Sequence, residues 1–184
     1  MKILAKFVFF SLVFFCLVAT SQAGWRPFRS QNRRSGEENA QRLMSDLKKL
    51  DPDMKRIFSN SVGWAVFPSI DKAGIGIGGA AGNGRVYRKG TFIGTTTMTQ
   101  VSIGFQFGGQ VYSEIIFFQD DHTLNKFKKG NFGIGGNISA VIADVGAAAE
   151  AGFKDGTIVV VKPKAGLMYE ATISGQKFTF KGKK

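Results

Sequence analysis

The stretch of sequence that decides the fold is residues 72–80, which read KAGIGIGGA. Isoleucine and glycine alternate there with the period of two that is typical of a β-strand. Glycine at alternate positions leaves one face of a strand without side chains, which permits sharp curvature or a close approach of another backbone. Residues 133–136 repeat the Gly-Ile-Gly-Gly string of residues 76–79. Because the chain has 24 Gly but only 4 Pro in 184 residues, we expect its glycines to lie inside regular structure rather than in linkers.

Outward from this stretch, apolar runs alternate with turn signals from Val62 to the C-terminal end, which predicts a series of short antiparallel strands. The strands are predicted at residues 64–67, 74–78, 85–88, 91–100, 101–107, 111–118, 132–142, 145–153, 157–162, 166–173 and 176–180. The turn signals between them are Gly82-Asn83-Gly84, Lys89-Gly90, Gly108-Gly109, Asp155-Gly156 and Ser174-Gly175.

A helix is predicted before this β body, over residues 37–50. Its start is expected to be capped by Ser35 or Gly36, and Asp51-Pro52 ends it because the residue before a proline disfavours helical geometry. The apolar side chains that follow the i, i+3, i+4, i+7 spacing of one helix face are Ala40, Leu43, Met44, Leu47 and Leu50. This apolar face is expected either to bind a membrane or to pack in the core.

Two shorter helices are predicted, at residues 53–58 and 121–130. The second is expected to be capped by Asp120 or Asp121 and to end at Gly130. The expected fold class is therefore α+β, with N-terminal helices followed by a strongly curved, glycine-rich antiparallel β-sheet or a barrel-like body.

The N-terminal 1–23 segment has the pattern of a cleaved secretory signal peptide. Two lysines precede the apolar run of residues 7–19, and residues 21–23, Ser-Gln-Ala, place small side chains at both positions that a signal peptidase reads. The apolar run is shorter than the roughly 20 residues of a spanning helix. Cys16 is the only cysteine, so the chain from Gly24 onward has none. An uncleaved N-terminal anchor is the alternative.

After the signal, we expect a flexible basic arm, residues 24–36, followed by a single domain, residues 37–184. The arm is expected to be flexible because its four arginines precede any acidic residue. The signal-peptide pattern predicts export, and we therefore expect a secreted or periplasmic protein that is peripherally associated with a membrane.

The charge of the chain favours an anionic partner. Lys+Arg number 25 against 13 Asp+Glu, a formal net charge of +12, and the arm combines its arginines with Trp25 and Phe28. Polybasic segments with interfacial aromatic side chains bind anionic membranes, with about 1 kcal/mol for each Lys or Arg near the surface. Nucleic acid is not the expected partner, because the sequence has no nucleic-acid-binding motif and export separates it from nucleic acid. The alternative is a basic surface that serves only solubility.

Enzyme chemistry is not expected, and neither is a cofactor or a metal. One His and one Cys exclude most zinc sites, haem attachment, a disulfide framework and a Cys/His nucleophile pair. Glu114, Glu150 and Glu170 lie in predicted strands, where such acids more often face solvent or pair with a basic residue than act as general acid and base.

Three further motifs also favour structural roles. Residues 74–79 spell G-x-G-x-x-G, but another strand follows them instead of the helix that dinucleotide binding requires. Residues 120–122, Asp-Asp-His, are expected to be a helix cap and not a metal site. Asn137-Ile138-Ser139 is a glycosylation acceptor only in a eukaryotic secretory pathway.

Several strings in a fixed order resemble the SYLF domain, a family of lipid-binding domains found in bacterial exported proteins and in eukaryotic membrane-traffic and actin-patch proteins. The resemblance covers about residues 37–181 and is closest to the bacterial, signal-bearing branch. The strings that carry it are residues 64–68, 72–80, 100–110, 112–118, 127–132, 166–171 and 175–178.

The resemblance implies binding to anionic lipids through a basic amphipathic N-terminal segment, which corresponds to residues 37–50 with the arm before them. The headgroups implied are phosphoinositides in eukaryotic members and phosphatidylglycerol or cardiolipin in a bacterial periplasm, and an actin-binding activity is also attributed to the domain in some eukaryotic relatives. The residues predicted to contact lipid are Trp25, Arg26, Phe28, Arg29, Arg33, Arg34, Lys48 and Lys49. The rival interpretation is a structural envelope protein or a small outer-membrane-associated β protein.

Overall fold

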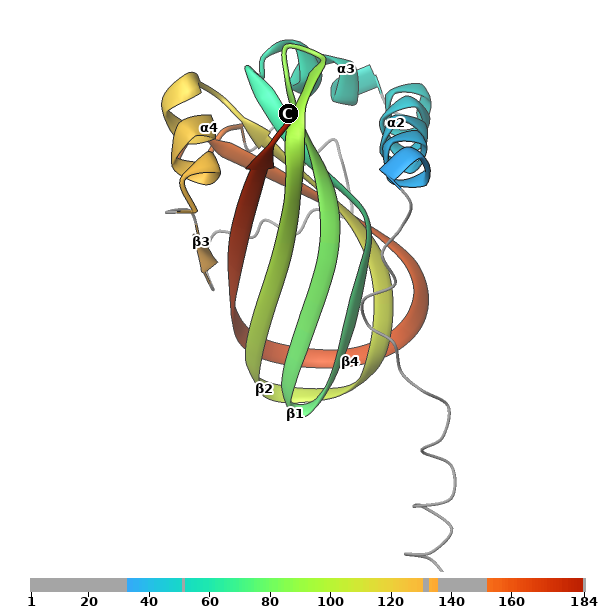
Figure 1. Ribbon diagram of the computed structural model, residues 1–184. Coiled ribbons are helices and arrows are strands. Elements are labelled where there is room, and N and C mark those ends of the chain that lie inside the picture. Colours follow the sequence, from blue (N-terminus) through green and yellow to red (C-terminus); the bar gives the residue numbers. More distant parts are fainter. Residues whose placement is uncertain (1–32, 51, 131–132, 136–151, 184) are drawn as a thin grey trace, which may run out of the picture. The chain divides into compact units, whose positions relative to one another are not determined.

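The computed structural model describes residues 33–50, 52–130, 133–135 and 152–183, all within one compact unit formed by residues 31–184 (Figure 1). Its helices are α2 (Arg33–Leu50), α3 (Pro52–Ser59) and α4 (Asp121–Lys128), and its strands are β1 (Gly63–Arg88), β2 (Thr91–Phe118), β3 (Gly133–Gly135) and β4 (Thr157–Gly182). The strands form one antiparallel sheet in the order β1-β2-β4-β3. The predicted α+β class is confirmed, and the sheet of the described residues is not closed into a barrel.

The three long strands are continuous where the sequence predicts several short ones. β1, β2 and β4 contain 26, 28 and 26 residues. The predicted turns at residues 82–84, 108–109 and 174–175 are therefore wrong, because all three lie inside paired strands. The turns at Lys89-Gly90 and Asp155-Gly156 are confirmed, and all four of these residues have the positive φ that tight turns use.

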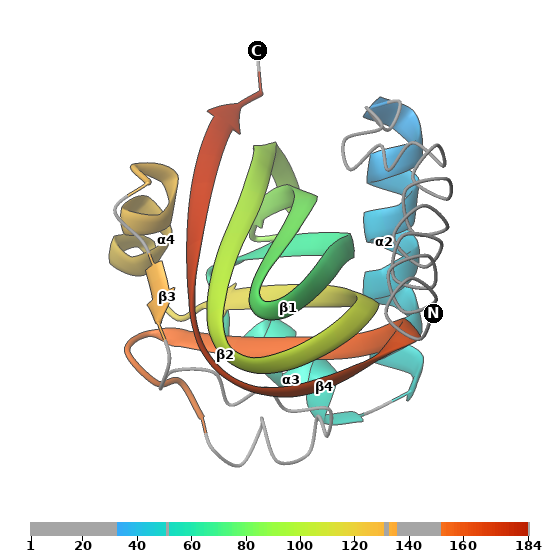
Figure 2. The same cartoon turned by 90° about the horizontal axis from the view of Figure 1, so that it is seen from below.

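A bend near the middle of these strands folds the sheet back on itself, as the curved ribbons at the bottom of Figure 1 and in Figure 2 show. Ile75 pairs with Phe107, but Ile77 pairs with Ile103, so Gly76 alone is opposite three residues of β2, two more than regular pairing would place there. The φ angles of Gly76, Gly104 and Gly108 are 70°, 140° and 122°, in the region that favours glycine. The curvature predicted from alternating glycines is confirmed here. We call the halves of the strands on either side of the bend the first limb, beginning at Gly63 in β1, and the second limb.

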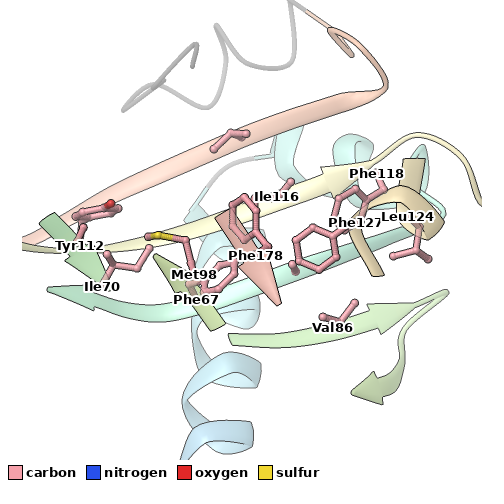
Figure 3. Close-up of a cluster of buried hydrophobic side chains, with 13 residues drawn as sticks. Phe67, Ile70, Val86, Met98, Tyr112, Ile116, Phe118, Leu124, Phe127 and Phe178 are labelled. Atoms are coloured by element: carbon pink, nitrogen blue, oxygen red, sulfur yellow. The ribbon is translucent and has the colours of Figure 1, made fainter. Parts of the chain in front are cut away.

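Strand alternation divides the buried side chains into two clusters on opposite faces of the sheet. The inner cluster lies between the two limbs, where the rings of Phe67 and Phe178 are 5.8 Å apart. Its buried members, many of them seen in Figure 3, are Ala65, Phe67, Ile70, Ala80, Val86, Met98, Tyr112, Ile116, Phe118, Leu124, Phe127, Val159 and Phe178. The outer cluster joins α2 and α3 to the other face of the first limb. Its buried members are Ala40, Leu47, Met54, Ile57, Phe58, Trp64, Val66, Tyr87, Ile115, Phe117, Ile158 and Val160.

The apolar face of α2 therefore packs in the core, so it is not a free membrane-binding face. The helix begins at Arg33, four residues before the predicted start at Glu37. The cap predicted at Ser35 or Gly36 and the end of the flexible arm at residue 36 are thus corrected. Gly36 is buried inside the helix, where an added Cβ would collide with the guanidinium of Arg85. A tertiary contact explains a glycine that local propensity alone assigns to a helix end.

The glycines of the mispredicted turn at residues 82–84 allow the second limb of β1 to lie close to the first. A Cβ on Gly82 would come within 2.6 Å of the Ile70 side chain, and one on Gly84 within 2.8 Å of the Phe67 ring. Real Cβ atoms do not approach other atoms so closely, so the packing between the limbs requires glycine at both positions.

We expect Gly84→Ala to lower the free energy of unfolding by about 2 kcal/mol, because the added methyl overpacks the inner cluster. Gly79→Ala is the matched control, since a Cβ on this exposed β1 glycine would meet nothing closer than 3.7 Å. Urea denaturation of residues 24–184, which contain the whole compact unit, measures both variants. Equal stability of the two variants would contradict the proposed close packing.

Candidate functional site

A basic depression lies between α2 and α3. It is lined by Gln41, Met44, Ser45, Lys48, Lys49 and Lys55. The buried stripe of α2 faces the sheet, so the lysines of its last turn lie on the part of the helix that remains accessible. Lysine amines, an amide and a hydroxyl are groups that donate hydrogen bonds to phosphate oxygens, and none of the described residues that line this surface is a carboxylate.

Aromatic rings of the outer cluster hold the amine of Lys48. Its Nζ atom lies 4.1 Å from the centroid of the Phe58 ring and 6.0 Å from that of Trp64. Trp64 in turn donates a hydrogen bond from Nε1 to the Met44 sulfur at 3.0 Å. These cation–π contacts orient Lys48 and leave its half-buried amine at the edge of the depression.

Among the predicted lipid-binding residues that the structure describes, Lys48 and Lys49 lie together at the depression. Arg33 and Arg34 lie in the first turn of α2, about 22 Å along the helix axis from Lys48. The other predicted residues, Trp25, Arg26, Phe28 and Arg29, lie outside the described residues.

Lys55 of α3 is the site residue that the sequence prediction omitted. It is exposed and lines the depression with the two lysines of α2. Its neighbour Arg56 does not line the depression and forms an exposed ion pair with Asp53 at 3.2 Å. The adjacent Lys55 and Arg56 in a predicted helix are a signal in the sequence, but the sequence does not show which of the two side chains lines the depression.

Of the candidate catalytic carboxylates, Glu114 is the one whose side chain is described, and it is buried with 1% exposure. Gln176 donates from Nε2 to Glu114 Oε2 at 3.1 Å and to Gln100 Oε1 at 3.0 Å, which links the first limb to the second. Among the described residues, Glu114 Oε1 and Gln176 Oε1 have no hydrogen-bond partner. Burial raises the pKa of Glu114 to about 7, against the smaller lowering effect of the Gln176 hydrogen bond. A group so enclosed has a structural role.

The Asp-Asp-His motif is a helix cap, as predicted. Asp120 accepts a hydrogen bond from the Thr123 backbone N–H at 2.8 Å, which lowers the pKa of its carboxyl. Asp121 pairs with Arg88 at 2.7 Å. Within the described ranges, no three His, Cys, Asp or Glu side chains are grouped as metal ligands.

The other motifs have the following outcomes. Residues 74–79 lie inside β1 and lead into more strand, so the structural interpretation of the G-x-G-x-x-G string is confirmed. Glu170 pairs with Gln106 in the backbone register of β4 and β2. Glu150 and Asn137 lie outside the described residues. No helix of the described ranges has both the length and the apolar composition to cross a membrane.

Comparison with known proteins supports the resemblance derived from the sequence. Residues 99–184 match the family model described as Ysc84, Las17-binding protein actin regulator. The match confirms the SYLF resemblance over this part of the chain, from the second limb of β2 through β4. No curated protein and no solved structure matches the chain.

Glu114 makes the stability of the fold depend on pH. Its pKa is raised from 4.5 to about 7 in the folded state. The contribution of the protonated Glu114 carboxyl to the free energy of unfolding is therefore fully present below pH 4.5 and is lost as pH rises through 7. The loss is about 3 kcal/mol, because the unfolded chain releases this proton at lower pH than the folded one.

We expect Glu114→Gln to remove this loss and to raise stability at pH 8, since a neutral amide both accepts from and donates to Gln176. Urea denaturation between pH 4 and pH 8 measures the effect, with the exposed Glu38→Gln as the control that keeps the loss. A pH dependence that survives in the Glu114 variant would assign it to another group.

Proposed function

With the match of residues 99–184 to the Ysc84 family as the premise, we propose that this protein is a non-enzymatic lipid-binding domain. It docks on anionic membrane surfaces, with phosphoinositide-like or phosphatidylglycerol-type headgroups as its ligands. The observation that carries the proposal is the depression between α2 and α3, where Lys48, Lys49 and Lys55 converge and no carboxylate is among the described lining residues.

The depression suits a phosphate group on chemical grounds. Three amines supply positive charge, and the amide of Gln41 and the hydroxyl of Ser45 supply further donors. Lys48 is held by the Phe58 ring, so less side-chain entropy is lost when it binds a headgroup. The affinity of such a site is electrostatic and is expected to fall with salt.

The arm provides a second contact in this proposal. Trp25 and Phe28 insert at the membrane interface, while Arg26 and Arg29, followed by the arginines at the start of α2, attract anionic lipid. The N-terminal segment acts as a signal peptide, so the protein is secreted or periplasmic and reaches its membrane as a peripheral protein.

We expect the double variant Lys49→Gln/Lys55→Gln to bind anionic vesicles about thirtyfold more weakly, since each lysine near the surface contributes about 1 kcal/mol. The matched control is Lys126→Gln/Lys129→Gln, which removes the same charge from exposed positions in and after α4. Co-sedimentation of residues 24–184 with phosphatidylglycerol vesicles at low salt measures both. Equal weakening would mean that net charge and not the depression determines binding.

We also expect replacement of Arg26, Arg29, Arg33 and Arg34 by Ser to weaken co-sedimentation, because four cations near the surface are lost. The variant is compared with wild type on neutral and on anionic vesicles. Unchanged binding to anionic vesicles would remove the arm from the site, and no binding by the wild type would contradict the lipid-binding function itself.

A further inference from the structure

The outer face of the sheet at the bend has a patch of exposed apolar side chains that the basic depression does not include. Ile75 is 77% exposed, Ile77 69%, Ile103 63%, Val101 62% and Phe107 62%. These five residues, which we call the bend patch, are the large apolar side chains most open to solvent in the described part of the chain. A group of this kind commonly marks an interaction surface.

The strand register makes the patch continuous. Ile75 is directly opposite Phe107, and Ile77 is directly opposite Ile103. Residues opposite each other in antiparallel strands project from the same face. Val101 is opposite Gly79, which has no side chain to cover it.

The backbone beneath the patch is held by the buried side chain of Gln106. Its Nε2 donates to the carbonyl oxygens of Gly76 at 3.0 Å and Ser102 at 3.1 Å, and its Oε1 accepts from the Ser102 hydroxyl at 2.8 Å. A Cβ on Gly78 would collide with this amide. Because these contacts fix the bend, the exposed side chains are presented on a rigid surface and do not belong to a free loop.

The charge beside the patch is positive. Lys177 is opposite Thr99 in the register of β4 and β2, and Thr99 is two residues from Val101, so the three share a face. Lys181 lies farther along the same face of β4, and both lysines are exposed. Asp71, also exposed, is four residues before Ile75 on β1.

We propose that the bend patch inserts into the interfacial layer of an anionic membrane while Lys177 contacts the headgroups. This inference rests on the proposed lipid-binding function and adds to it a third contact, besides the depression and the arm. The patch begins about 40 Å along β1 from the start of the strand, where α3 ends, and Figure 1 shows the bend at the opposite end of the sheet from α3. The bend patch is therefore separate from the lysine depression.

A membrane fits the patch better than a second copy of the chain does. Two copies joined through their patches would bring together two chains that each carry a large excess of Lys and Arg over Asp and Glu. Like charges across an interface oppose association. An anionic bilayer instead offers hydrocarbon for the isoleucines and phosphates for the lysines.

A fluorescent label tests the insertion directly. Residues 24–184 contain no cysteine, so Ile103→Cys introduces a unique site for an environment-sensitive dye. Thr179→Cys is the matched control, because Thr179 is exposed on the same face between Lys177 and Lys181. With phosphatidylglycerol-containing vesicles, the emission of the dye at position 103 is expected to shift to the blue and to be quenched by lipid-attached quenchers, and the dye at position 179 much less.

A binding measurement complements the label. We expect Ile77→Ser/Ile103→Ser to partition into these vesicles at least about tenfold more weakly. The variant lacks the two apolar side chains whose transfer from water into the membrane favours binding. Thermal melting is expected to be nearly unchanged, since both side chains are exposed in the free protein. The variant Lys49→Gln/Lys55→Gln serves for comparison, because it lowers the charge of the separate lysine depression and leaves the bend patch unchanged.

The outcomes separate this inference from the proposed function. Wild-type protein that does not bind anionic vesicles would overturn both. Binding with an unshifted label at position 103 and an unaffected double serine variant would overturn insertion of the patch alone. A label that is already blue-shifted without vesicles would also overturn it, and gel filtration would then show whether a second copy covers the patch.

Discussion

The structure depends on the buried side-chain amide of Gln106, which lies at the bend beside the glycines of β1. Gln106 bonds to the backbone of Gly76 and to both the backbone and the hydroxyl of Ser102, and glycine at position 78 leaves the room it occupies. These contacts stabilise the bend that turns the three long strands back on themselves. Without the bend the inner face would have no partner, because it packs against the other half of the same sheet.

The bend explains both the core and the exposed surface. In the limbs, aromatic side chains such as Phe67 and Phe178 meet across the fold, and α2 and α3 cover the outer face of the first limb. At the bend itself the outer face is convex, and Ile75, Ile77 and their neighbours stay open to solvent. Apolar side chains that water surrounds contribute nothing to folding, which favours a role for them in contact with another surface.

Polar groups also connect the two limbs, at a cost in stability. Glu114 in the first limb and Gln100 in the second share the amide of Gln176. A carboxyl in this position is favoured in its neutral form, because burial raises its pKa. The basic groups are distributed differently, since Lys48, Lys49 and Lys55 remain at the surface between the helices. Surface cations are thus concentrated where α2 meets α3.

The sequence by itself determined the local elements. Proline at position 52, the cap at Asp120, the alternation of the strands and the glycines of the bend all act through the backbone preferences of neighbouring residues. Only the tertiary structure shows that position 84 requires glycine and that Lys55 lines the same depression as Lys48. Gly84 lies against Phe67, 17 residues away, and Lys55 belongs to a different helix. Such contacts join different segments of the chain, so no pattern within one segment encodes them and they exist only once these segments have packed together.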